Sequence, residues 1–188
     1  MLRHNVHHLP LVKHDKVIGI VALNDIVQYE SQSSLLLVRG ILLQETVEGL
    51  AELSAQVASV MVRMQKEGAN SHMIGNAMSV IGRTFKQRLL QLAEEKLGPP
   101  PVPYCFLALG SMAREEQLLV TDQDNAMILS QDYRAADHGE YFKQLANFVC
   151  DGLDACGYTY FEGDIMASNP NLRLILTLGK GQFSPVAY

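Results

Sequence analysis

The chain has 188 residues, of which 48% are hydrophobic and 19% are charged, and its formal net charge is −5 at pH 7. This length and composition can support one core of moderate size or two small ones. The acidic balance excludes a protein that binds nucleic acid through a broad basic face, although an acidic protein can still bind nucleotides through metal ions. No apolar stretch reaches the roughly 18 to 20 residues that cross a bilayer, and the first residues lack the apolar core of a signal peptide. We therefore expect a cytoplasmic protein without a membrane or nucleic-acid partner.

The cysteines and histidines do not predict a metal site of their own. The three cysteines, Cys105, Cys150 and Cys156, form no CxxC pair and have no zinc-like spacing to histidine. They are expected to be reduced thiols. The histidines near the start of the chain lie within predicted strands and their turn, so we assign them no metal.

Residues 1–30 predict a β-hairpin followed by a helix. Two short apolar runs, 6–12 and 17–23, flank a polar turn, and the next two residues, Asn24 and Asp25, are typical of a helix N-terminus. The string HHLPLVKHDKVIGIVALNDIV resembles the second half of a CBS (cystathionine β-synthase-type) motif. In that family a hydroxyl residue and an acid contact ribose; Asp25 matches the acid, but Ala22 stands in place of the hydroxyl. The resemblance implies a partial CBS-like segment, either a fragment or a remnant of a regulatory module, without a competent adenosine site.

Residues 31–98 predict two helices that pack against each other. Apolar residues recur every three or four positions, first over 43–64 and again over 74–92, which lays one apolar stripe along each of two long helices. Gly68 can adopt the positive φ angle that ends a helix, and Asn70 can cap the next one. We expect a helical hairpin or bundle, whose outer surface is also the expected contact of a homodimer.

A proline-rich run, 99–103, follows these helices. Proline lacks a backbone donor and disfavours helix in the residue before it, so the run predicts a spacer. We expect it to separate the helical region from a second domain over 99–188. The fold class predicted for the whole chain is therefore α/β (α+β), with a helical N-terminal segment before a small mixed sheet.

The stretch 107–129 holds the residues with the clearest chemical meaning. It predicts an apolar strand that ends at Gly110 and Ser111, a short polar helix, and a second strand that opens with Asp122 and Asp124. Residues two apart on a strand share a face, so these carboxylates would lie side by side. Such a pair repels unless a cation lies between, and hard oxygen ligands suit Mg²⁺ or Mn²⁺.

The residues before the acidic pair are suited to phosphate. Gly110 lets the backbone come close to an anion, Ser111 offers a hydroxyl, and a helix that starts just after them presents free N–H groups. The stretch thus predicts a site for a metal-bound nucleoside triphosphate. Gln117 and Gln123, within it, are interpreted as surface or hydrogen-bonding residues.

The strings GSMAREE and TDQDNA in this stretch resemble the signature of the polymerase-β-type nucleotidyltransferase superfamily. They are similar in particular to the PII-uridylyltransferase-like branch and to the nucleotidyltransferase domains that follow CBS domains in bacterial signalling proteins. The resemblance implies that Asp122 and Asp124 are catalytic and hold the metal, while Gly110 and Ser111 hold the outer phosphates. It makes Arg114 a candidate for binding phosphate or orienting the carboxylates.

The remainder of the chain predicts a helix, 136–156, ended by Gly157, and then a strand, 158–161. Because superfamily members generally carry a third carboxylate on a later strand, Asp164 is the candidate for it, with Glu162 behind it. The segment 166–170 also resembles the CBS-linked branch, where it would shape the floor of the pocket. The alternating leucines of 172–178 fit either a strand or a buried helix. The C-terminal region that holds the acceptor in relatives is expected to be absent.

The resemblance implies metal-dependent transfer of a nucleoside monophosphate from an NTP to an acceptor, as in uridylyl- and adenylyltransferases. The acceptor would be a protein by analogy, in bacterial signal transduction. The alternative is a non-catalytic nucleotide-binding regulatory module, or a dimerisation module built on the helices.

Overall fold

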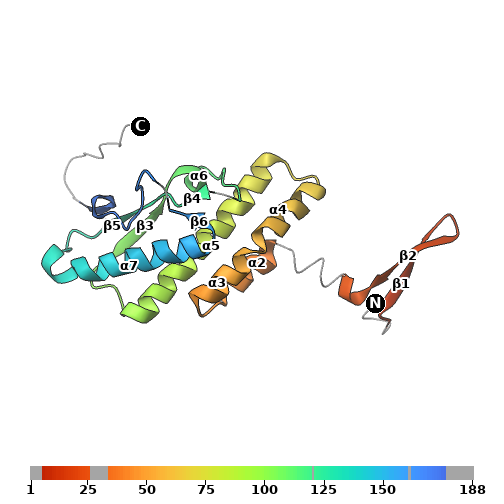
Figure 1. The fold of residues 1–188 in the computed structure, drawn as a ribbon, viewed down its shortest axis with the longest axis horizontal. Helices are drawn as coiled ribbons and strands as arrows, with labels where there is room; N and C mark the ends of the chain where they lie inside the picture. Colours follow the sequence, from red (N-terminus) through yellow and green to blue (C-terminus); the bar gives the residue numbers. More distant parts are fainter. Residues whose placement is uncertain (1–5, 26–33, 120, 161, 177–188) are drawn as a thin grey trace.

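The computed structural model describes residues 6–25, 34–119, 121–160 and 162–176. It combines helices with small sheets, which confirms the predicted α/β class (Figure 1). Among the described residues, no helix is both long enough and apolar enough to cross a membrane.

The predicted hairpin is present near the start of the chain. Strands β1 (His8–Lys13) and β2 (Lys16–Ala22) pair antiparallel across a two-residue turn at His14 and Asp15, whose φ angles are 49° and 58°. Positive φ at both residues matches the right-handed twist of the paired strands. A helical turn begins at Leu23, where the Asp25 carboxylate accepts a hydrogen bond from the Ala22 N–H at 2.7 Å. Asp25, in the helical turn, therefore caps the N-terminal end of that turn through its side chain.

The first long helix predicted over 43–64 is wrong, because the structure divides this region into short helices. These are α2 (Ser34–Leu42), α3 (Val47–Ser54) and α4 (Val57–Lys66). Thr46 starts α3 by accepting a hydrogen bond from the Gly49 N–H at 3.1 Å, and Leu43, before it, is 67% exposed. A hydroxyl that caps a new helix competes with continuation of the previous one, and apolar periodicity does not detect such a break.

Helix α5 (Ser71–Leu97) has the ends that the sequence predicts. The Asn70 side chain accepts a hydrogen bond from the Met73 N–H at 2.9 Å, and Gly68 and Gly98 have φ angles of +85° and +88°. A helix thus begins at an Asx cap and ends at a glycine that can turn the chain.

Apart from the β1–β2 hairpin, the described strands form two small sheets rather than one. In the first, β5 (Asn125–Leu129) lies between β3 (Tyr104–Ala108), antiparallel to it, and β7 (Arg173–Ile175), parallel to it. In the second, β4 (Thr121–Asp122) pairs parallel with β6 (Tyr158–Thr159). The strand expected to open with the two aspartates is therefore split between the sheets. β7 follows a short 3₁₀ helix, Pro170–Leu172. Of the two structures predicted for 172–178, the described residues therefore form a strand and not a buried helix.

One hydrophobic core joins the helical region to the strands. Helix α7 (Ala135–Ala155) packs along α5 (Figure 1), and a Cβ on Gly152 of α7 would overlap the Leu89 side chain of α5. The core residues Phe85, on α5, and Phe142, on α7, are fully buried. The proline-rich run after α5 is therefore not a division in the core. α7 ends at Gly157, with φ +88°, as predicted.

Candidate functional site

The two aspartates lie where the chain passes from β4 to β5. Between them, Gln123 is only 1% exposed, and its Nε2 donates to the carbonyls of Cys150 at 2.9 Å and Tyr158 at 3.1 Å. Because neighbouring side chains in extended backbone point to opposite sides, the inward Gln123 leaves Asp122 and Asp124 on the outer side. Asp122 is exposed and Asp124 half-buried. Gln123 is thus a hydrogen-bonding residue, as interpreted from the sequence, but it is buried rather than on the surface.

Nearby cations offset the charge of this pair only in part. Burial raises the pKa of the Asp124 carboxyl, and the neighbouring charge of Asp122 raises it further, while Lys86 and Arg114 lower it in part. A carboxyl whose pKa is raised by a like charge is stabilised as an anion when a cation approaches. Two carboxylates placed in this way fit a hard divalent ion such as Mg²⁺ or Mn²⁺.

Gly110 brings the Gly-Ser turn against the acidic pair. It begins the four-residue helix α6 (Gly110–Ala113) with a φ of +56°, and a Cβ at this position would overlap the Asp124 carboxylate. The Leu109 N–H also donates to the Asp124 carbonyl at 3.1 Å. A helix of four residues develops little of the macrodipole, so phosphate binding at Ser111 would depend on individual groups. The turn and the acidic pair form one unit.

Lys86 is a site residue that the sequence analysis missed. It projects from α5, is 4% exposed, and donates from Nζ to the Asp124 carbonyl at 3.2 Å. Desolvation lowers its pKa to about 8, although the nearby Cys150 and Asp124 oppose this change. The sequence does hold one indication of this lysine: a charged residue follows Phe85 directly, within the buried stripe of a helix. Lysine is rare at such positions unless it has a partner.

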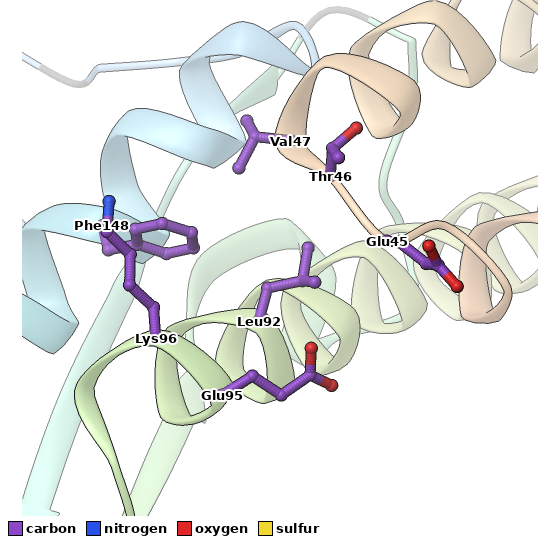
Figure 2. A pocket seen from close by; sticks show the side chains of 7 residues that line it. All are labelled: Glu45, Thr46, Val47, Leu92, Glu95, Lys96 and Phe148. Carbon is purple, nitrogen blue, oxygen red and sulfur yellow. The ribbon is translucent and has the colours of Figure 1, made fainter.

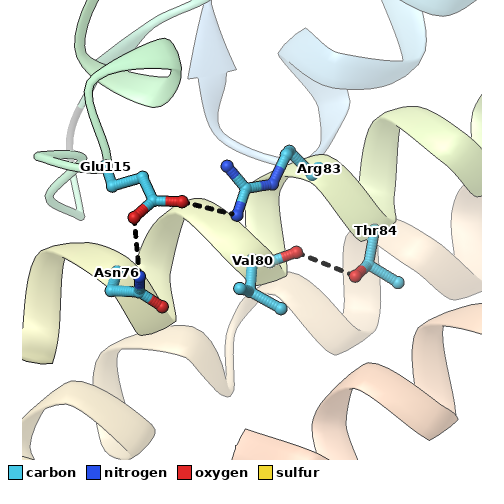
Figure 3. Close-up of polar contacts among 5 residues, drawn as sticks. All are labelled: Asn76, Val80, Arg83, Thr84 and Glu115. Carbon is cyan, nitrogen blue, oxygen red and sulfur yellow. Dashed lines mark hydrogen bonds and ion pairs between the residues drawn. The ribbon is translucent and has the colours of Figure 1, made fainter.

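Arg114 lies on the loop that leaves α6. Its Nε pairs with Glu116 at 2.8 Å, its side chain is 63% exposed, and its charge acts on Asp124. The structure therefore brings Arg114 into the electrostatic range of the acidic pair, on a side open to solvent. The next residue, Glu115, is held by side chains of α5 (Figure 3).

Asp164 is placed differently from the other predicted acids. It is exposed, has a φ of +54°, and its carbonyl accepts a hydrogen bond from Asn169 Nδ2 at 3.1 Å. Its neighbour Ile165 accepts from the Asn125 N–H at 3.0 Å, which joins this segment to the start of β5. Within the described ranges, no three His, Cys, Asp or Glu side chains are grouped so that they could hold a metal ion. The structure brings Asp122 and Asp124 together without adding Asp164 or Glu162 to them.

Buried amides support the acidic pair from behind. Asn125 is fully buried, and its Oδ1 accepts a hydrogen bond from the Ala167 N–H at 2.7 Å, which fixes the segment expected to form the pocket floor. Gln117, 1% exposed, donates from Nε2 to Thr121 Oγ1 at 2.9 Å and so holds the start of β4. Gln117 is therefore a buried residue too.

A hollow of about 310 Å³ lies elsewhere on the molecule (Figure 2). Val47, Leu92 and Phe148 give it an apolar floor, and Glu45, Glu95 and Lys96 lie at its edge. Lys96 Nζ stands 5.3 Å from the centre of the Phe148 ring. None of the predicted site residues lines this hollow.

The structure thus places an acidic pair at the junction of β4 and β5, next to a glycine-serine turn and a short helix, as the sequence predicts for a nucleotidyltransferase. In sequence, residues 55–184 match the family described as "Putative nucleotidyltransferase DUF294". The match covers more than half of the chain, which belongs to this family. No curated protein and no solved structure matches the chain.

Proposed function

We propose that this protein transfers a nucleoside monophosphate from a metal-bound NTP to an acceptor, with pyrophosphate as the leaving group. The observation that carries the proposal is the outward-facing pair Asp122 and Asp124, in which burial and mutual repulsion raise the pKa of Asp124. Membership in the nucleotidyltransferase family supports it.

Each residue of the site has a role in this proposal. Asp122 and Asp124 would hold Mg²⁺ or Mn²⁺, and the bound ion would offset charge on the triphosphate during in-line displacement at the α-phosphorus. Gly110 leaves room for Asp124 and, with Ser111, would face the outer phosphates. Arg114 would bind the same phosphates from the loop after α6, because guanidinium groups bind phosphate oxygens with two parallel donors.

The acceptor is proposed by resemblance alone. The likeness of GSMAREE and TDQDNA to the PII-uridylyltransferase-like branch favours a protein acceptor in a signalling pathway. The partial CBS-like segment at the start of the chain supports the same context.

A non-catalytic nucleotide-binding module is the second candidate. It is favoured by one observation, that the described residues add no third acid to Asp122 and Asp124. With only two carboxylates, a second metal ion would be bound weakly, and binding without turnover would result.

Turnover separates the two candidates. The protein is incubated with each α-labelled NTP and Mg²⁺, and release of pyrophosphate is measured together with formation of labelled NMP or labelled protein. The transferase proposal predicts release that Asp122→Asn/Asp124→Asn removes. Binding of an NTP with no product above that of the variant would support the non-catalytic module instead.

A further inference from the structure

The loop after α6 carries Arg114 to the site, and helix α5 holds the next residue of that loop. Asn76 Nδ2 donates to Glu115 Oε2 at 2.7 Å, and Arg83 Nη2 approaches Glu115 Oε1 at 3.4 Å. Figure 3 shows both α5 side chains directed at the one carboxylate. The two contacts span 39 and 32 residues of sequence, so they fix a local turn to a distant helix.

The backbone of the loop is also seated on α5. A Cβ on Gly75 would lie 2.7 Å from the Glu115 carbonyl oxygen and 3.2 Å from Glu116 Cα, distances that leave no room for a side chain. Glu115 itself has a φ of +59°, a conformation that a residue with a Cβ adopts at a cost. A strained residue persists where its surroundings hold it, and the glycine, amide and guanidinium of α5 do so here.

The same face of α5 continues to the acidic pair. Arg83 and Lys86 are three residues apart and so neighbours on one side of the helix, and Lys86 contacts the Asp124 carbonyl at 3.2 Å. Helix α5 thus contacts both the segment that holds Asp124 and the loop that holds Arg114. Asp124 follows Arg114 by ten positions in the chain, and α5 supports both parts of the site together.

We propose that Glu115 is a positioning residue, held by Asn76 and Arg83, which fixes the loop so that Arg114 faces the triphosphate. This inference rests on the proposed nucleotide site. An exposed arginine on a free loop loses much conformational entropy on binding, whereas one on an anchored loop has lost part of it beforehand. The anchor therefore acts on nucleotide affinity through Arg114 and does not itself touch the nucleotide.

The test combines hydrogen exchange at the amides of residues 113–117 with calorimetric NTP binding. Asn76→Asp places a second carboxylate against Glu115 and should release the loop, with faster exchange and affinity about twofold to tenfold weaker, as expected when one long side chain must again be ordered on binding. Adding Glu115→Gln to this variant restores the hydrogen bond with its direction reversed, because the glutamine amide at position 115 can donate to the new carboxylate at position 76. We expect the double variant to recover most of both properties. Asn147→Asp, on the exposed face of α7, adds the same charge away from the loop and is the matched control.

The outcomes separate this inference from the proposed function. If Asn76→Asp leaves loop exchange unchanged, or speeds it without changing the affinity of a binding-competent protein, the positioning role is wrong. If Asn76→Asp weakens binding and Glu115→Gln does not restore it, a general structural defect replaces the anchor as the cause. If the wild type binds no NTP, the proposed function is wrong. Hydrogen exchange then still tests whether Asn76 and Arg83 hold the loop through Glu115.

Discussion

Gly110 is the residue on which the acidic pair most directly depends. Its φ of +56° would strain a residue with a side chain, and a Cβ would overlap the Asp124 carboxylate. No other residue type fits this position without displacing the Asp124 carboxylate, because a Cβ would overlap the carboxylate itself.

Substitution Gly110→Ala is expected to lower the free energy of unfolding by about 2 to 4 kcal/mol, from backbone strain together with the steric overlap. It should also abolish metal-dependent NTP binding. Chemical denaturation and calorimetry measure the two effects. Gly157→Ala is the matched control, because its φ is +88° and a Cβ there would meet open space. The control should lose about 1 kcal/mol of stability and keep its binding; equal losses in the two variants would contradict the account.

Lys86 should make the stability of the protein depend on pH. Desolvation lowers its pKa from 10.5 to about 8 in the folded protein, so the unfolded chain binds more protons between these values. Stability contributed by this group therefore increases as pH rises from about 8 towards 10.5, by up to about 3 kcal/mol.

We expect the wild type to gain stability relative to Lys86→Met over that pH range in metal-free buffer. Because the Cys150 thiol interacts with Lys86, both proteins should be compared in a Cys150→Ser background. Denaturant unfolding at several pH values measures the difference. A difference that stays constant, or that changes in the opposite direction, would show that Lys86 is not held in a desolvated site.

Among the elements, those with local signals were predicted well from the sequence. Asn70 and Gly98 mark the ends of α5, and Gly157 marks the end of α7, because a cap or a positive φ angle depends on the residue itself. The hairpin β1–β2 was predicted because apolar runs flank a short polar turn.

Elements that depend on distant partners were not predicted. The strand with the two aspartates is split because β4 pairs with β6, whose register joins Asp122 to Thr159, far along the chain. The participation of Lys86, Asn76 and Arg83 in the site could not be read from spacing, since each reaches a residue more than 30 positions away. The acidic pair itself was predictable because alternation along an extended segment is local.

Several apolar side chains of the hairpin are exposed and are not covered by the other described elements. Val17, Ile18 and Ile20 of β2 are 65%, 62% and 66% exposed, although all three are strongly apolar. A two-stranded hairpin buries little surface by itself.

At the scale of the whole molecule, helix α5 connects the helical region to the site. It packs on α2, α4, α6 and α7, and its side chains contact both Asp124 and Glu115. The helices that precede the strands are therefore part of the support of the site. A change in the packing of α5 would reach the proposed nucleotide site through Lys86 and the loop that carries Glu115.

Calorimetric titration shows most directly whether Asp122 and Asp124 bind a metal-bound nucleotide. ATP, UTP, GTP and CTP are titrated with and without Mg²⁺ into the wild type, Asp122→Asn/Asp124→Asn, and a control of equal charge change, Glu48→Gln/Glu52→Gln on the exposed side of α3. We expect Mg²⁺-dependent binding of at least one NTP by the wild type and the control, and loss of this binding in the aspartate variant alone. No binding of any NTP by folded wild-type protein, or equal binding by the aspartate variant, would contradict this expectation.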